Sequence, residues 1–188
     1  MIPAPITEVY AALVDPEALS AWVPPGDMTG TIERFEPRPG GSYRMVLRYP
    51  DHSPSQGRTT SDTEVVEARF IDLVSNRRVV YPVDVVSDDP DDSEAMTMRR
   101  ELTDTDGGTL VKITADNVPD AVSAHDHAAG LESSLEKLAA YVAGWDHRLS
   151  LIAGHEPVLR LFGDCSQDRR YPAPAASPIV ATVAGTDP

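Results

Sequence analysis

Cysteine, basic residues and long apolar runs are scarce in this 188-residue chain, and each scarcity excludes a class of protein. The one cysteine, Cys165, rules out an intramolecular disulfide framework, and no CxxC pair is present to form a zinc or redox site. The 16 Lys and Arg against 30 Asp and Glu give a net charge of −14, which argues against nucleic-acid binding. No apolar run approaches the roughly 18 residues of a membrane span, and the first residues lack a secretory signal, so we expect a cytoplasmic protein.

Two short helices are predicted at the start of the chain and one long helix nearer its end. Apolar residues at helical spacing mark the first helix, over 7–14. Asp15 and Pro16 are typical of the N-cap and first residue of a second helix that runs to Trp22. The long helix is expected over 123–142, with Gly144 in the position of a terminating glycine.

The segment between these helices alternates apolar and polar residues with a period of two, which is typical of strands. Glycine pairs at 40–41 and 107–108 lie between neighbouring strands, where glycine permits the positive φ of a tight turn. This order of elements predicts an α+β domain in which a long helix lies over a curved antiparallel sheet. The six predicted strands cover residues 29–36, 43–49, 59–68, 78–86, 95–103 and 109–115.

Several stretches of the sequence, in the same order, are similar to one known family. They are DPEALSAW at 15–22, PRPGG at 37–41, and MTMRRELTDTDGGTLVKITADNVP at 96–119, followed by HDHAAGLESSLEKLAAYV at 125–142. Over residues 3–143 the chain resembles the START/SRPBCC helix-grip proteins, in the branch similar to activators of a chaperone ATPase. The resemblance implies a seven-stranded antiparallel sheet that wraps around a long C-terminal helix, with an apolar cavity between them.

The resemblance divides the chain into a helix-grip domain at 1–143 and a tail at 144–188. The tail is predicted to be partly helical at first and then, in its Pro/Ala-rich part at 171–178, extended or disordered.

Apolar, methionine and aromatic side chains of the strands and the closing helix converge on the predicted interior. Packing alone would make them an ordinary core. A helix-grip architecture instead implies a cavity where they meet, lined by adaptable methionines and by tyrosine hydroxyls that can orient a ligand. The candidate ligand-binding residues are Trp22, Met28, Tyr43, Met45, Leu47, Tyr49, Phe70, Tyr81, Met96, Met98, His127, Leu131 and Leu135.

His127 is the polar member of this set. It shares a helical stripe with Leu131 and Leu135, whereas His125 lies about 200° away around the helix, so His127 is expected to face the interior. It is either a histidine at the edge of the core that donates to a backbone carbonyl, or a group at the cavity mouth that hydrogen-bonds a ligand or moves a proton. The two histidines do not face each other on a helix, so no metal site is predicted.

Motifs for catalysis or cofactor binding are not found. The sequence lacks Gly-x-Ser-x-Gly, a phosphate-binding glycine loop, a dinucleotide fingerprint and HExxH. His155 and Cys165 lie in the irregular tail, where no rigid scaffold would position them as base and nucleophile.

Two groups of charged residues are interpreted as surface features. The acidic run at 84–94 lacks the alternation and central glycine of a calcium loop, so we interpret it as a solvated hairpin loop. Arginines on the predicted strands are expected to lie mostly on the outer face of the sheet and to pair with acids; they are Arg44, Arg48, Arg58, Arg99 and Arg100.

Three functions are compatible with these features. The leading one is binding of a small apolar or amphipathic molecule between the sheet and the closing helix, without a cofactor. An alternative is an enzyme similar to polyketide cyclases, which would need at least two titratable groups converging in the cavity. The third is an interaction module that stimulates a chaperone ATPase, as the family branch implies. A membrane span and a nucleic-acid partner are not expected, and a homodimer is left open.

The first strand of the family is almost absent, because only Met1 and Ile2 are available to form it. That strand lies between the second and the last strands, so its absence would leave two rows of backbone groups unpaired. Either the natural chain begins upstream, or the tail supplies the strand through its β-rich residues 178–185. In the second case the strand could insert within its own chain or swap into a partner.

Overall fold

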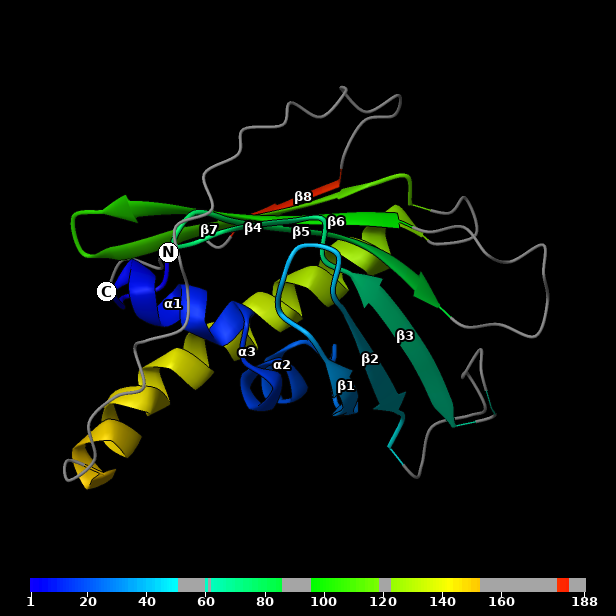
Figure 1. The fold of residues 1–188 in the computed structure, drawn as a ribbon, viewed down its shortest axis with the longest axis horizontal. Coiled ribbons are helices and arrows are strands. Elements are labelled where there is room, and N and C mark those ends of the chain that lie inside the picture. The colour runs from blue at the N-terminus through cyan, green and yellow to red at the C-terminus, as the bar shows by residue number, and fades with distance from the viewer. Residues whose placement is uncertain (51–59, 61, 86–95, 119–122, 153–178, 183–188) are drawn as a thin grey trace.

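An antiparallel sheet curves over one long helix in the computed structural model, which describes residues 1–50, 60, 62–85, 96–118, 123–152 and 179–182 (Figure 1). All three helices lie on the concave side of the sheet. The predicted α+β helix-grip architecture is therefore confirmed. In chain order the elements are α1 (Ile6–Leu13), α2 (Pro16–Trp22), β1 (Thr29–Phe35), β2 (Ser42–Arg48), β3 (Thr63–Arg69), β4 (Asp72–Val74), β5 (Arg78–Val85), β6 (Met96–Thr105), β7 (Gly108–Asp116), α3 (Ala124–Ile152) and β8 (Ile179–Thr182).

The two short helices begin where the sequence predicts. Asp15 accepts a hydrogen bond from the Ala18 N–H at 2.8 Å, and Pro16 occupies the first turn of α2. At the other end of α2, the indole Nε1 of Trp22 donates to the Ala12 carbonyl at 2.9 Å. This buried bond joins α1 to α2 and fixes the Trp22 ring in the core.

The sheet runs in the order β1-β2-β3-β5-β6-β7-β8, and the short strand β4, which the sequence analysis did not predict, pairs with β5. The β6–β7 hairpin turns at Gly107 and Gly108, with φ values of 113° and 145°, as the glycine pair predicted. A Cβ at Gly108 would lie 2.1 Å from the Ile2 carbonyl oxygen. Glycine is therefore needed there both for the turn and for the close approach of the N-terminal segment.

The closing helix is longer than predicted. We expected it to end near Val142, but α3 continues to Ile152 and Gly144 lies inside it. A glycine in a helix interior costs only about 1 kcal/mol relative to alanine, so it weakens the helix without ending it. The expected boundary at residue 143 consequently falls within a helix.

Two distant segments pair with the outer edge of β7. Ile2 and Thr109 exchange two backbone hydrogen bonds, each of 2.8 Å. Further along β7, β8 pairs antiparallel from Lys112 opposite Thr182 to Ala115 opposite Ile179. The tail thus supplies a strand within its own chain, one of the two alternatives left open by the sequence. Within the described residues β8 has β7 as its strand partner and ends the sheet, whereas the family pattern would place it between two strands.

Some predictions concern residues outside the described ranges: Arg58, most of the acidic run, His155, Cys165 and the Pro/Ala-rich segment at 171–178. Of the helices in the described part of the chain, none has the length and apolarity needed to cross a membrane.

Candidate functional site

Three buried aromatic rings of the grip form a cluster built from β2, β5 and the connection after β3. The rings of Tyr43, Phe70 and Tyr81 contact one another in pairs, with centroids 5.6 to 5.9 Å apart. Trp22 lies beside them at the end of α2 and is fully buried. Tilted and edge-on ring pairs of this kind stabilise a core beyond the area that they bury. Burial raises the pKa of the Tyr43 hydroxyl to about 12, so it stays protonated at neutral pH.

Most of the other candidate residues are buried between the sheet and α3. Alternation along β2 directs Met45 and Leu47 to the concave face, and alternation along β6 directs Met98 to the same face. Leu131 and Leu135 face them from α3. Nine of the thirteen predicted residues are buried, and they are Trp22, Tyr43, Met45, Leu47, Phe70, Tyr81, Met98, Leu131 and Leu135.

The four half-buried candidates, Met28, Tyr49, Met96 and His127, all lie at one end of the grip. Met28 precedes β1, Tyr49 follows β2, Met96 begins β6 and His127 is in the first turn of α3. Antiparallel pairing brings the start of β1 to the end of β2, and the start of β6 to the end of β5. We call this end of the grip, defined by these four residues, the rim.

Polar groups are also present at the rim. The Tyr49 hydroxyl donates to Glu64 at 2.8 Å, and burial together with this carboxylate raises the Tyr49 pKa to about 12. His127 is half-buried and His125 is exposed, as the helical phase predicts. Burial lowers the His127 pKa, and its Nδ1 atom is buried without a hydrogen-bond partner. A bond from His127 to a backbone carbonyl, one of the two expected alternatives, is therefore not made through Nδ1.

Arg100 is the exception to the prediction that the strand arginines lie mostly outside. Arg44 and Arg48 do pair with acids, Arg44 with Glu33 and Glu67 and Arg48 with Asp62. Arg100 instead points into the grip and is 4% exposed. Arg99 and Arg100 are consecutive on β6, and successive side chains on a strand point to opposite faces, so one of the two must face inward. This rule was the signal that the sequence analysis missed.

The Arg100 guanidinium lies between two aromatic rings. Its Cζ atom is 4.8 Å from the Trp22 ring centroid and 4.9 Å from that of Tyr81. Its Nε atom is buried and has no hydrogen-bond partner. Burial lowers the Arg100 pKa to about 10, which still leaves the side chain positively charged at neutral pH.

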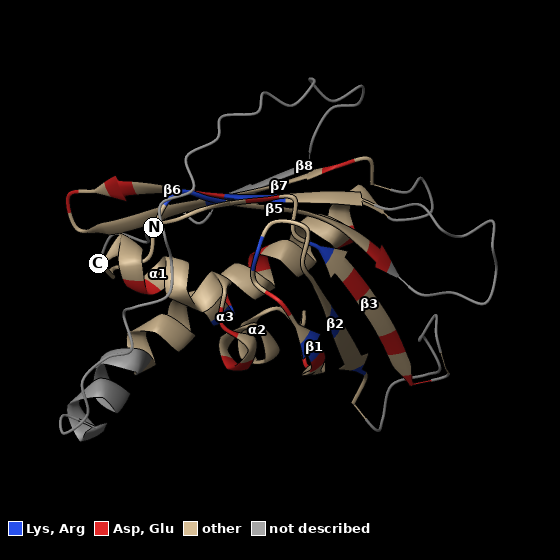
Figure 2. Cartoon of the chain, in the orientation of Figure 1, with Lys and Arg blue, Asp and Glu red and all other residues tan. Residues whose placement is uncertain are grey.

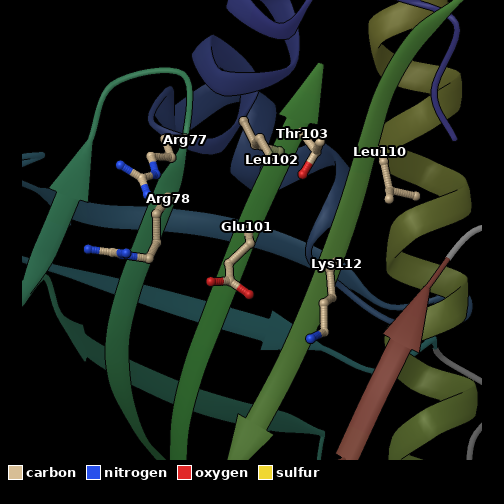
Figure 3. Close-up of a pocket in the computed structure, with 7 residues that line it drawn as sticks. All are labelled: Arg77, Arg78, Glu101, Leu102, Thr103, Leu110 and Lys112. Carbon is tan, nitrogen blue, oxygen red and sulfur yellow. The ribbon is translucent and has the colours of Figure 1, made fainter. Parts of the chain in front are cut away.

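A pocket of about 270 Å³ is found elsewhere, on β5, β6 and β7 (Figure 3). Figure 2 shows basic residues on these middle strands and also on β1 and β2, while acids are spread over the molecule. The pocket is lined by three basic side chains and one acid, and this acid, Glu101, is the cross-strand partner of both Arg78 and Lys112. Arg78 is also paired with Asp72. The pocket's lining is Arg77, Arg78, Glu101, Leu102, Thr103, Leu110 and Lys112.

The described residues contain no group of three or more His, Cys, Asp or Glu side chains that could hold a metal ion. The polar groups that remain in the grip are a cation, a histidine and protonated tyrosines. Such groups can bind and orient a polar end of an apolar molecule.

The fold and this interior define a helix-grip protein with an aromatic floor. A family model described as "Activator of Hsp90 ATPase homolog 1-like protein" matches residues 3–143, and the chain belongs to that family. A comparison with curated proteins gave no match.

Solved structures support the same assignment of fold. A protein from Chromobacterium violaceum is 28% identical, with a TM-score of 0.66 over 75% of this chain and 91% of the other. A protein from Rhodobacter sphaeroides is 22% identical, with a TM-score of 0.62 over 77% and 89%. A protein from Arthrobacter aurescens is 15% identical, with a TM-score of 0.64 over 76% and 81%.

Proposed function

We propose that this protein binds a small amphipathic molecule between the sheet and α3, and that the molecule enters at the rim. The observation that carries the proposal is Arg100, a charged side chain buried among aromatic rings with its Nε–H unpaired. A core that serves only stability gains nothing from a charge of this kind, because a buried cation is costly unless it is paired. A ligand with one polar end would supply the missing partner.

The lining suits such a ligand. Met45 and Met98 are unbranched and can repack around molecules of different shape, whereas the tilted rings of Tyr43 and Phe70 form a firm floor. The rim is half-buried, which is the degree of exposure expected of residues at an entrance. We place this activity in the cytoplasm, and it requires no cofactor.

Binding is favoured over cyclase-like catalysis by the protonation states of the polar groups. A general base works best with a pKa near the operating pH. The pKa of Tyr43 is raised to about 12, and Arg100 stays protonated. His127, whose pKa is lowered by burial, is then the one imidazole in a candidate set without a carboxyl group, while a cyclase would need a second acid–base group.

Titration with Nile red, a neutral dye that fluoresces strongly in apolar surroundings, tests the proposal. We expect saturable binding by the wild-type protein. Met96→Trp narrows the rim and should weaken binding about tenfold, a change typical of overpacking by one large side chain. Val46→Trp is the matched control, since Val46 is also half-buried on a strand but alternates to the outer face.

Two results would contradict the proposal. Absence of dye binding would show that the interior is a closed core. Equal binding by the wild type and both tryptophan variants would place the dye outside the grip. Native mass spectrometry of the freshly purified protein should also reveal a bound small molecule that organic extraction removes.

A further inference from the structure

Arg100 has an arrangement of neighbours that points to a particular ligand chemistry. It is the one basic side chain among the buried residues of the described chain. No carboxylate of the described residues forms an ion pair with it, although the chain carries 30 acids. Its guanidinium plane is held by Trp22 and Tyr81 rather than by an anion. Among the described residues the charge is thus positioned by packing and has no ion-pair partner.

The Nε–H of Arg100 donates a hydrogen bond in one fixed direction. Arginine donates through a planar fork, and its side edge, formed by Nε–H and one terminal N–H, matches the two oxygens of a carboxylate. In Arg100 the Nε–H on this edge has no acceptor. The guanidinium carbon lies over the Trp22 and Tyr81 rings, and the Nε–H is the donor for which an acceptor is missing.

The position of Arg100 also sets a length for the ligand. Met96 lies at the rim and Arg100 is four residues further along β6, about 13 Å at the rise of a strand. Between them Met98 faces the same interior, opposite Tyr81 of β5. The side chains between the rim and the charge are therefore apolar, over a distance about equal to a medium-length alkyl chain.

We propose that the ligand is an elongated apolar carboxylate, which binds with its carboxylate on the Nε edge of Arg100 and its apolar body along Met98 toward the rim. This inference rests on the proposed function and names the ligand class for the same site. The net charge of −14 opposes the approach of any anion, so a preference for a carboxylate would have to arise locally at Arg100.

Displacement of Nile red by two matched probes tests the inference. Decanoate and decan-1-ol share the same chain length and differ in the terminal group. For the wild-type protein we expect decanoate to displace the dye at a concentration about 10- to 100-fold lower than decan-1-ol, a range typical of charge-assisted hydrogen bonds. Equal potency, or a preference for the alcohol, would overturn the inference.

Variants test whether the preference for decanoate over decan-1-ol depends on Arg100. Arg100→Met should abolish the preference for decanoate, whereas Arg99→Met, its neighbour on the opposite face of β6, should retain it. Arg100→Lys keeps the charge and loses the planar fork, so it should retain a reduced preference; this variant keeps the test decisive if the methionine variant does not fold. A wild-type preference that persists in a folded Arg100→Met protein would refute the assignment.

Failure of the two proposals can be told apart. If Nile red does not bind, the proposed function itself fails. If Nile red binds and decanoate shows no advantage, the grip binds apolar molecules and the carboxylate inference alone is wrong.

Discussion

Replacing Arg100 with methionine should stabilise the ligand-free protein. Methionine keeps an unbranched stem between Trp22 and Tyr81 and removes the guanidinium. Burial lowers the Arg100 pKa from its ordinary value to about 10, which corresponds to roughly 3 kcal/mol of unfavourable interaction of the charged form. Loss of the cation–π contacts forfeits about 2 kcal/mol in the opposite direction. The net expectation is a gain of about 1 kcal/mol in the free energy of unfolding.

Urea denaturation and calorimetry can measure this gain. For a chain of this length a gain of 1 kcal/mol raises Tm by about 2–4 °C. Arg99→Met provides the control and should stay within about 0.5 kcal/mol of the wild type, because it changes a half-buried residue on the outer face. A decrease of more than about 2 kcal/mol in the free energy of unfolding of Arg100→Met would show that the guanidinium stabilises the core. Stability alone would then explain why Arg100 is buried, and its burial would no longer support a role in ligand binding.

Three other changes have expected outcomes. Truncation before residue 179 removes the four pairings of β8 with β7 and should lower Tm by several degrees, because each lost backbone bond is worth about 1 kcal/mol, partly offset by released chain entropy; an unchanged Tm would show that β8 adds no stability. Asp15→Ala removes the cap on Ala18 and should cost about 1 kcal/mol in urea denaturation, whereas Asp15→Asn should cost little; equal losses would contradict the capping role. Burial lowers the His127 pKa, so the folded state binds a proton less readily than the unfolded state. The free energy of unfolding therefore keeps its full value above about pH 6.5, the ordinary pKa of histidine, and decreases as the pH falls below it. In thermal melts, the Tm of His127→Gln should decrease less than that of the wild type between pH 7 and 5, while the Tm of the exposed His125→Gln should follow the wild type. Identical pH profiles for all three proteins would refute this role of His127.

Features of the fold with local causes could be predicted from the sequence. The Asp15 cap, the proline after it and the glycine turn at 107–108 act through neighbouring residues, and each is found in the structure. Strand periodicity explains which side chains of β2 face inward or outward, and helix periodicity explains why His127 is more buried than His125. The helix-grip arrangement itself required the order of several motifs, because no single element specifies how a sheet curves.

The remaining features depend on contacts between distant segments. Strand β4 has three residues and exists through its pairing with β5, so its own sequence carries almost no periodic signal. The position of β8 depends on an open edge at β7, which a composition rich in proline and alanine does not reveal. The burial of Arg100 differs from these cases, because the polarity of arginine favours the outer face whereas the alternation of the strand places it on the inner one. Its burial depends on Trp22, 78 positions earlier in the chain, which supplies the aromatic surface against it.

The pairing of β7 with both ends of the chain has a consequence for synthesis. Ile2 is made before β7, but 65 residues separate Asp116 at the end of β7 from Thr182 at the end of β8. Because the ribosome produces the chain from its N-terminus, residues 112–115 of β7 can be translated and paired with β6 while their other partner does not yet exist. An open strand edge pairs readily with any extended peptide, and neighbouring nascent chains on one messenger would present the same edge to each other. The last strand therefore closes the sheet late, and slow translation of the final third of the message would lengthen the interval in which copies of this protein can join edge to edge.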